Sequence, residues 1–256
     1  MDIKQIKQSY KQEKKRIRAK ERLALDNAKE RYLHETEAYY LQNGRPAPKN
    51  PPKRPLLEEI GNSVTHGVGA LFATVAFLLM ALASQGATQT LGAVFYFVGA
   101  LVMFTMSCLY HAFPHGSRVK RIFRRFDYSS IYLLIGATFA PILLNLGGTL
   151  GLVFFIVQWV IIATGITFVG VFGPTRLKWL HVPLYFILGW SGLMLIPAML
   201  EVGLGFVLYI VGGGIVYSLG IIPFLMHKGP SHFIWHFFVL LGDIVQWLGI
   251  YLYIYL

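Results

Sequence analysis

The chain has 256 residues, of which 55% are hydrophobic, and it carries a formal net charge of +11 and one cysteine. Its charges are unevenly spread: residues 1–60 hold 15 Lys and Arg and 9 Asp and Glu, whereas residues 61–256 hold only 8 and 3. A soluble domain carries about 25% charged residues, so the composition excludes a water-soluble globular enzyme. The single cysteine, Cys108, excludes an internal disulfide framework and a cysteine-cluster metal site.

Residues 1–43 form a charged segment rich in Lys, Glu, Arg, Gln and Ala, which favour helix. The apolar residues of this segment are sparse and hold no heptad, and two interpretations therefore stay open. The segment is either a solvated helix that frays into disorder, or a surface helix that contacts anionic lipid or another subunit. Residues 44–56 follow as a Pro-rich, semi-rigid linker. We expect neither segment to carry chemistry.

Residues 57–256 contain seven apolar runs, and about 20 apolar residues suffice to cross about 30 Å of hydrocarbon as a helix. We therefore predict an all-α, polytopic integral membrane protein with a bundle of seven transmembrane helices. The predicted spans are Ser63–Ser84, Leu91–His111, Asp127–Leu146, Leu150–Phe172, Trp179–Leu200, Gly203–Leu225 and His232–Ile254.

The basic residues after position 60 all lie in alternate loops, on one side of the predicted bundle. They are Arg118, Lys120, Arg121, Arg124, Arg125, Arg176, Lys178 and Lys228. By the positive-inside rule the N-terminus is cytoplasmic and the C-terminus is outside, in a multi-pass plasma membrane protein. The basic segments then face the anionic inner leaflet, and the charge gives no evidence of a nucleic-acid partner. This orientation is opposite to that of G-protein-coupled receptors, and the seventh span lacks the lysine of a retinal protein.

Four ionisable residues lie at the same depth in this topology. His111 ends the second span, Asp127 begins the third, and His232 and His236 open the seventh on one helical face. Three neutral imidazoles with an open fourth position are the ligand set of a catalytic zinc, and the lack of thiolates favours that metal. The sequence therefore predicts a zinc site of His111, His232 and His236 at the cytoplasmic boundary.

Two further polar residues are candidates for catalysis. Asp127 is placed to hold a histidine N–H or the zinc-bound water, and Ser107, four residues before His111, to hydrogen-bond the same water or a substrate oxygen. Each histidine taken alone also fits a simple interfacial side chain. The other histidines, His34, His66, His115, His181 and His227, are expected to be interfacial or loop residues. Asp243 is expected to be a hydrogen-bonded packing carboxylate, and Gln158 and Gln246 to bond between helices.

Four ordered motifs at the span ends resemble those of the hemolysin III family, the bacterial branch of the progestin and adipoQ receptor proteins. They are Glu58-Glu59-Ile60-Gly61-Asn62-Ser63-Val64-Thr65-His66-Gly67, Ser107-Cys108-Leu109-Tyr110-His111, Asp127-Tyr128-Ser129-Ser130-Ile131-Tyr132 and His232-Phe233-Ile234-Trp235-His236. The resemblance covers residues 57–256 and implies the same three zinc ligands, with Asp127 supporting the zinc-bound water beside Ser107. Glu59, Asn62 and His66 match a family motif to which the resemblance assigns no role.

Three functions remain open at this point. The first is a zinc-dependent hydrolase of a lipid amide or ester, because eukaryotic relatives resemble receptors with ceramidase-type activity. The second is a non-enzymatic, receptor-like protein of membrane fluidity or energetic homeostasis, in which the zinc is structural. The third is cytolysis, which the family name suggests although the sequence predicts no pore lining.

Overall fold

The computed structural model describes residues 2–42, 51–226 and 229–256, and the chain divides into two compact units between Pro51 and Pro52. In the first unit α1 (Ile3–Gln42) is a single helix of 40 residues whose described side chains are mostly exposed. Most of the predicted linker, and the basic residue Lys228, lie outside the described residues. Residues 51–55 form a strap without regular secondary structure directly before α2, and residues 52–55 of it belong to the second unit.

The second unit contains seven helices long and apolar enough to cross a membrane, and the described residues contain no strand. The predicted all-α, seven-helix fold is therefore confirmed. The helices are α2 (Leu56–Ala83), α3 (Ala87–Ala112), α4 (Arg118–Leu146), α5 (Gly148–Phe172), α6 (Lys178–Trp190) with η1 (Ser191–Leu195) and α7 (Ile196–Val202), α8 (Leu204–Met226), and α9 (Ser231–Ile250) with the π-helical turn η2 (Tyr251–Tyr255).

Two helices begin well before the predicted spans. α2 starts at Leu56, where the prediction had Ser63, and α4 starts at Arg118, where it had Asp127. The Ser117 side chain caps α4 by accepting a hydrogen bond from the Lys120 backbone N–H at 3.1 Å. The apolar runs correspond only to the part of each helix that would lie in hydrocarbon. The polar first turns of α2 and α4 therefore fall outside the predicted spans. Basic residues of the predicted loop are consequently helical.

The fifth span is broken, although the prediction treated it as continuous. A 3₁₀ turn, η1, separates α6 from α7, and Pro197 lies in the first turn of α7. Proline has no backbone N–H to give to the preceding turn, and tighter 3₁₀ bonding is a common local solution. The break therefore lies where the sequence removes a helical hydrogen-bond donor.

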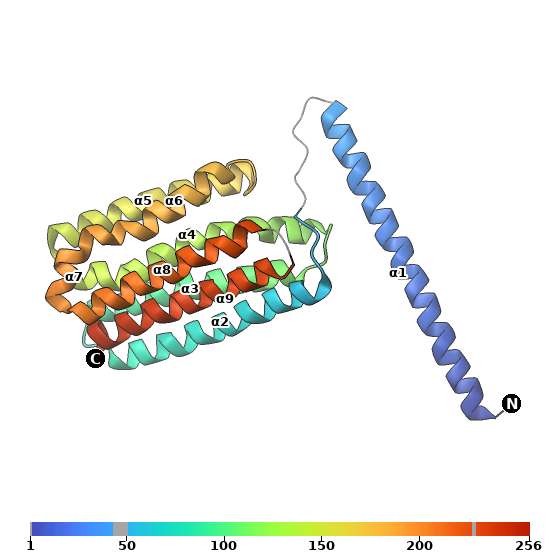
Figure 1. Cartoon of the computed structure of the whole chain (residues 1–256), viewed down its shortest axis with the longest axis horizontal. Helices are drawn as coiled ribbons and strands as arrows, with labels where there is room; N and C mark the ends of the chain where they lie inside the picture. Colours follow the sequence, from blue (N-terminus) through green and yellow to red (C-terminus); the bar gives the residue numbers. More distant parts are fainter. Residues whose placement is uncertain (1, 43–50, 227–228) are drawn as a thin grey trace. The chain divides into compact units, whose positions relative to one another are not determined.

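The helices pack in a mostly antiparallel bundle (Figure 1). α3 packs between α2 and α4, α8 packs against α9, and α4 also contacts α5. Close approach of α3 and α4 depends on Gly99, since a Cβ there would overlap Ala137 and stand 2.8 Å from the Leu133 carbonyl oxygen. Small residues allow such contacts in membrane bundles, where burial of apolar surface from lipid contributes little.

Polar side chains inside the bundle join different helices, as the sequence predicted. Gln158 donates to the Ser191 hydroxyl at 3.0 Å, and Gln246 donates to the Ile210 carbonyl at 3.0 Å. Asp243 is fully buried and accepts a hydrogen bond from the Tyr96 hydroxyl at 3.0 Å. These residues therefore act as hydrogen-bonded packing groups, and they leave the candidate chemistry to one end of the bundle. At that end α2, α4 and α9 begin and α3 ends (Figure 1).

Candidate metal centre

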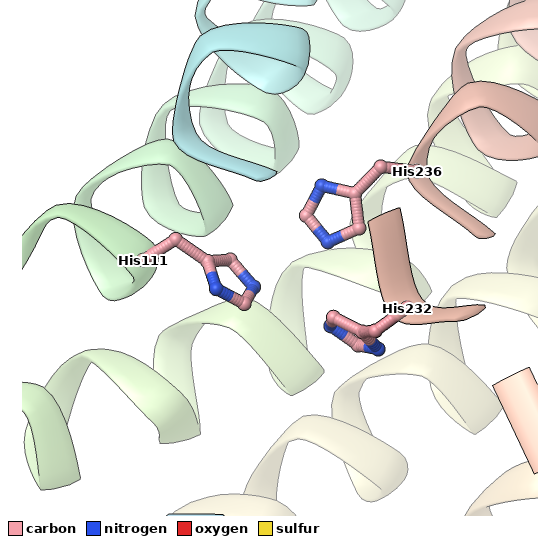
Figure 2. Close-up of side chains that lie close together, drawn as sticks. All are labelled: His111, His232 and His236. Atoms are coloured by element: carbon pink, nitrogen blue, oxygen red, sulfur yellow. The ribbon is translucent and has the colours of Figure 1, made fainter. Parts of the chain in front are cut away.

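The three predicted zinc ligands converge. His111 comes from the last turn of α3, and His232 and His236 come from the first two turns of α9. One nitrogen from each ring lies within 4.8 Å of the others, and the ring centroids are 4.8 to 5.2 Å apart. Figure 2 shows the three imidazoles gathered around one space. His111 and His232 are 121 positions apart in the sequence, and they come together because α3 and α9 both pack against α2.

The donor set fits a tetrahedral metal with one open position. Zinc–nitrogen bonds of about 2.0–2.1 Å set neighbouring nitrogens about 3.4 Å apart, and the three ligand nitrogens lie within 4.8 Å of one another without a metal. His111 and His236 are each 2% exposed, and His232 is partly exposed. The His111 Nε2 atom is buried and has no hydrogen-bond partner among the described residues. An unpartnered buried nitrogen costs free energy unless a metal or another group engages it.

The other nitrogen of two of these rings is held by α2. His111 Nδ1 lies 2.5 Å from Glu59 Oε2 and 3.2 Å from the Asn62 side-chain nitrogen. The amide nitrogen is a donor and can bond Nδ1 only when Nδ1 carries no proton, whereas the carboxylate accepts from a protonated Nδ1. We place the proton on Nδ1, donated to Glu59, because the carboxylate is the closer partner and a charge-assisted acceptor. His236 Nδ1 donates to the Asn62 backbone carbonyl at 3.2 Å. Both rings are thereby oriented with Nε2 toward the shared space, as in metal sites generally.

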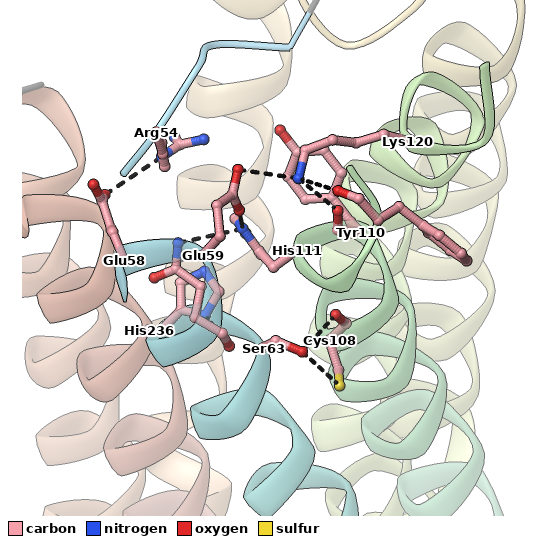
Figure 3. A network of polar contacts seen from close by, with 11 residues as sticks. Arg54, Glu58, Glu59, Ser63, Cys108, Tyr110, His111, Lys120 and His236 are labelled. Atoms are coloured by element: carbon pink, nitrogen blue, oxygen red, sulfur yellow. Dashed lines mark hydrogen bonds and ion pairs between the residues drawn. The ribbon is translucent and has the colours of Figure 1, made fainter. Parts of the chain in front are cut away.

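Glu59 is itself held by a buried lysine. The Lys120 ammonium lies 3.0 Å from Glu59 Oε1 and donates to the backbone carbonyls of Tyr110 and Phe113, each at 3.0 Å. Lys120 is 1% exposed, and its three donors have three acceptors. Figure 3 shows this network joining α2, α3 and α4 around His111. Sequence reasoning missed Lys120, because it stands among five basic residues of one short segment and nothing in the pattern distinguishes it.

The two candidate catalytic residues lie together. The Ser107 hydroxyl hydrogen-bonds the Asp127 carboxylate, and both residues line a large cavity together with His232 and His236. Ser107 is 1% exposed, and Asp127 is partly exposed. The sequence prediction that these residues stand near the histidine cluster therefore has a structural basis, and their catalytic role stays a prediction.

The expectation for two other histidines was wrong. His66 and His181 are each 1% exposed, although they were expected to be interfacial or loop residues. The His66 ring stacks on His236 with centroids 3.8 Å apart, and neither His66 nitrogen has a hydrogen-bond partner in the described part of the chain. His181 Nδ1 lies 2.9 Å from the Tyr132 hydroxyl. The prediction for His66 failed because α2 begins seven residues, about two turns, earlier than predicted. The prediction for His181 failed because the fifth span packs against α4. His227 lies outside the described residues.

The cavity extends from the histidines toward the middle of the bundle. Its free space, including its open mouth, is about 1340 Å³. Polar groups gather near the histidines, whereas the deeper wall is mainly apolar and aromatic. That deeper wall includes Met103, Ile131, Leu134, Phe139, Val182, Phe186, Trp190, Ile221 and Val239. A pocket with an apolar body and a few convergent polar groups at one end is typical of a site for an amphipathic ligand.

Known proteins match the part of the chain that carries the histidine cluster. A family described as "Haemolysin-III related" matches residues 55–247. The chain is 36% identical over 204 residues to "Hemolysin-3" of Bacillus cereus, covering 77% of this chain and 92% of that protein. It is 36% identical over 193 residues to "Hemolysin-3 homolog" of Bacillus subtilis (strain 168), covering 73% of this chain and 89% of that one. The matched region contains the motifs of the histidine cluster, and it leaves α1 unmatched.

Proposed function

The chain belongs to the haemolysin III family, and we propose that it is a zinc-dependent hydrolase of a lipid amide or ester. One observation carries the proposal: three imidazoles that could hold a metal converge at the polar end of an apolar cavity inside a membrane bundle. An acyl chain matches the apolar wall, and the bond to be cleaved then stands at the histidines. Seven membrane-length helices restrict access mainly to molecules that reside in lipid.

Zinc at this site supplies a Lewis acid that polarises a carbonyl and activates water near neutral pH. His111, His232 and His236 would hold it through one nitrogen each. Glu59 and the Asn62 carbonyl orient two of the rings through their opposite nitrogens. Asp127 is the proposed proton acceptor, and the Ser107 hydroxyl positions its carboxylate and is the proposed contact for a substrate oxygen.

A combined metal and turnover assay tests the proposal. The purified protein, its His111→Ala, His232→Ala and His236→Ala variants and a His34→Ala control are analysed for bound zinc. Each is then incubated in detergent micelles with a fluorescent N-acyl sphingosine and with a fluorescent acyl ester. We expect one zinc per chain and release of fatty acid in the wild type and control, and loss of both in the three variants. Equal fatty-acid release by all five proteins contradicts the proposal.

A second candidate is a non-enzymatic membrane protein with a structural metal, and one observation favours it. α3 packs mainly on α2 and α4, whereas α9 packs mainly on α8 and α2, so a metal held by His111 and His236 would bridge α3 and α9. Structural zinc sites stabilise folds in this way. Under this alternative the histidine variants lose thermal stability while the wild type shows no turnover of either substrate.

We also propose that the protein lies in the plasma membrane with its N-terminus in the cytoplasm. The described basic residues after position 60 cluster at the end of the bundle where α2 and α4 begin, and the positive-inside rule assigns that end to the cytoplasm. The basic residues would then contact anionic lipid of the inner leaflet. Labelling with a membrane-impermeant thiol reagent tests this, using Cys108→Ala protein with a cysteine added at either terminus. Labelling of intact cells at the N-terminus contradicts it.

A further inference from the structure

Two arginines stand at the polar end of the cavity, beside the histidine cluster. Arg54 comes from the strap before α2, and Arg124 comes from α4, one turn before Asp127; both line the cavity. Arg124 is only 8% exposed. Arg54 pairs with Glu58 through its Nε atom at 3.5 Å, while its Nη1 atom is buried without a hydrogen-bond partner in the described ranges. Burial of a guanidinium N–H beside a cavity is costly unless a ligand oxygen or water accepts from it.

The two guanidinium groups come from separate segments but influence the same side chains. The charges of Arg54 and Arg124 both act on Asp127, on Tyr110 and on Tyr128. Arg124 also lies over the Tyr128 ring, 5.8 Å from its centroid, and hydrogen-bonds that side chain. All five residues line the cavity. The arginines therefore face one polar chamber, which the histidines share.

The third nearby cation does not compete for this role. Lys120 gives its three donors to Glu59, Tyr110 and Phe113, so it has none left for a ligand. Arg54, Lys120 and Arg124 together balance the carboxylates of Glu58, Glu59 and Asp127. With the charges balanced, the arginines still offer an anion charge-assisted and bidentate hydrogen bonds, which need no metal. A divalent metal at the histidines would add net positive charge to this end of the cavity.

We propose that Arg54 and Arg124 bind an anionic oxygen group, a phosphate or a carboxylate, on the lipid whose chain occupies the cavity. This deepens the proposed function, on which it rests for the entry of a lipid, and it makes the preferred ligand an anionic amphiphile. The arginines bind the headgroup, and the apolar wall binds the chain. The histidine cluster then meets a bond close to the charged group. Arginine suits this role because its planar fork matches both anions.

Binding to metal-free protein tests the inference without any turnover. Protein treated with chelator, in neutral maltoside micelles, is titrated with dodecyl phosphate, dodecanoate, dodecanol and inorganic phosphate. The variants are Arg54→Gln, Arg124→Gln and Arg124→Lys, with Arg118→Gln as the control, because Arg118 is exposed on the same helix as Arg124. Native mass spectrometry or calorimetry reports affinity, and gel filtration and melting temperature report folding.

We expect the two anionic amphiphiles to bind at least about tenfold more tightly than dodecanol. Each Gln variant should lose about tenfold of that affinity without affecting dodecanol, as expected for a charged hydrogen bond. Arg124→Lys should retain part of it, and Arg118→Gln all of it. If Arg124→Gln fails to fold, Arg54→Gln still decides, because Arg54 lies outside the helices. Equal binding of dodecanol and dodecyl phosphate overturns the inference, as does unchanged affinity in Arg54→Gln.

Inorganic phosphate distinguishes a lipid headgroup from a free anion. If it binds as tightly as dodecyl phosphate with the same dependence on the arginines, the lipid assignment is overturned. The result is also separable from the proposed function. If the anionic amphiphiles bind through the arginines but no lipid is hydrolysed, only the proposed enzymatic activity is refuted. Hydrolysis of a neutral lipid at an unchanged KM in Arg54→Gln refutes only the anionic headgroup.

Discussion

Removal of the Glu59 carboxylate is the sharpest test of the histidine network. Its ion pair with Lys120 has an N–O distance of 3.0 Å, and the two side chains are 12% and 1% exposed. Charge centres about 4 Å apart attract by about 4 kcal/mol at an effective dielectric constant of about 20. Breaking a buried pair typically costs about 3–5 kcal/mol, and Lys120 keeps two carbonyl acceptors. We therefore expect Glu59→Ala to lower the free energy of unfolding by about 3 kcal/mol.

Zinc affinity gives an independent readout of the same change. Glu59→Ala should weaken zinc binding about 10–100-fold, because His111 Nδ1 loses its acceptor. Glu59→Gln should lose less, since its amide oxygen still accepts from that N–H. Lys120→Met should lower the free energy of unfolding, with a smaller change in zinc affinity than Glu59→Ala. The double variant Glu59→Ala/Lys120→Met should lose about 2 kcal/mol less unfolding free energy than the sum of the two single variants. Chelator competition and chemical unfolding in micelles measure these quantities.

Glu58→Ala is the matched control for zinc affinity. Glu58 is the adjacent carboxylate in α2, and it pairs with Arg54 at 3.5 Å. Its removal should leave zinc binding within about twofold of the wild type. Wild-type zinc affinity in Glu59→Ala would refute the assigned role of Glu59. Strict additivity of Glu59→Ala and Lys120→Met would refute the buried ion pair.

Three further outcomes follow from the structure. Removal of the metal by chelator should lower the melting temperature, because a ligand at 100 times its Kd stabilises the folded state by about 2.7 kcal/mol. The melting temperature of the His236→Ala variant should not change with chelator. His66→Phe should still bind one zinc per chain by elemental analysis, because His66 stacks on His236 and is not part of the ligand cluster; loss of the metal would make His66 a ligand. Gly99→Leu should destabilise the bundle by about 1–3 kcal/mol through overlap with Ala137, whereas Gly212→Ala, with open space around it, should be neutral in the same unfolding assay.

The seven-helix fold and the three histidines that could hold a metal could be predicted from residue patterns alone. Apolar runs of membrane length require helices, because backbone groups in lipid must bond within their own segment. Alternation of span direction then places His111, His232 and His236 at one depth whatever the packing. Ser107 and Asp127 follow from the same reasoning. These features depend on local sequence and on the membrane as solvent.

The groups that orient the cluster depended on tertiary contacts. Glu59 and Asn62 act on the histidines only because α2 lies beside α3 and α9, and their motif carried no sign of that role. Lys120 is a buried counterion only because α4 begins at Arg118 and packs its first turn against the end of α3. Arg54 and Arg124, 70 positions apart, line one cavity for the same reason. Nothing in the sequence around these basic residues indicates which of them become buried.

The sequence by itself thus determined that the chain spans a membrane seven times and holds three histidines in one layer. Hydropathy and charge are properties of single residues summed over short windows, and they suffice for both conclusions. The tertiary structure alone decided which carboxylate faces which ring, which lysine is buried, and which arginines face the cavity. Those contacts arise from the rotation and register of packed helices, and a shift of one residue turns a side chain by about 100° around its helix.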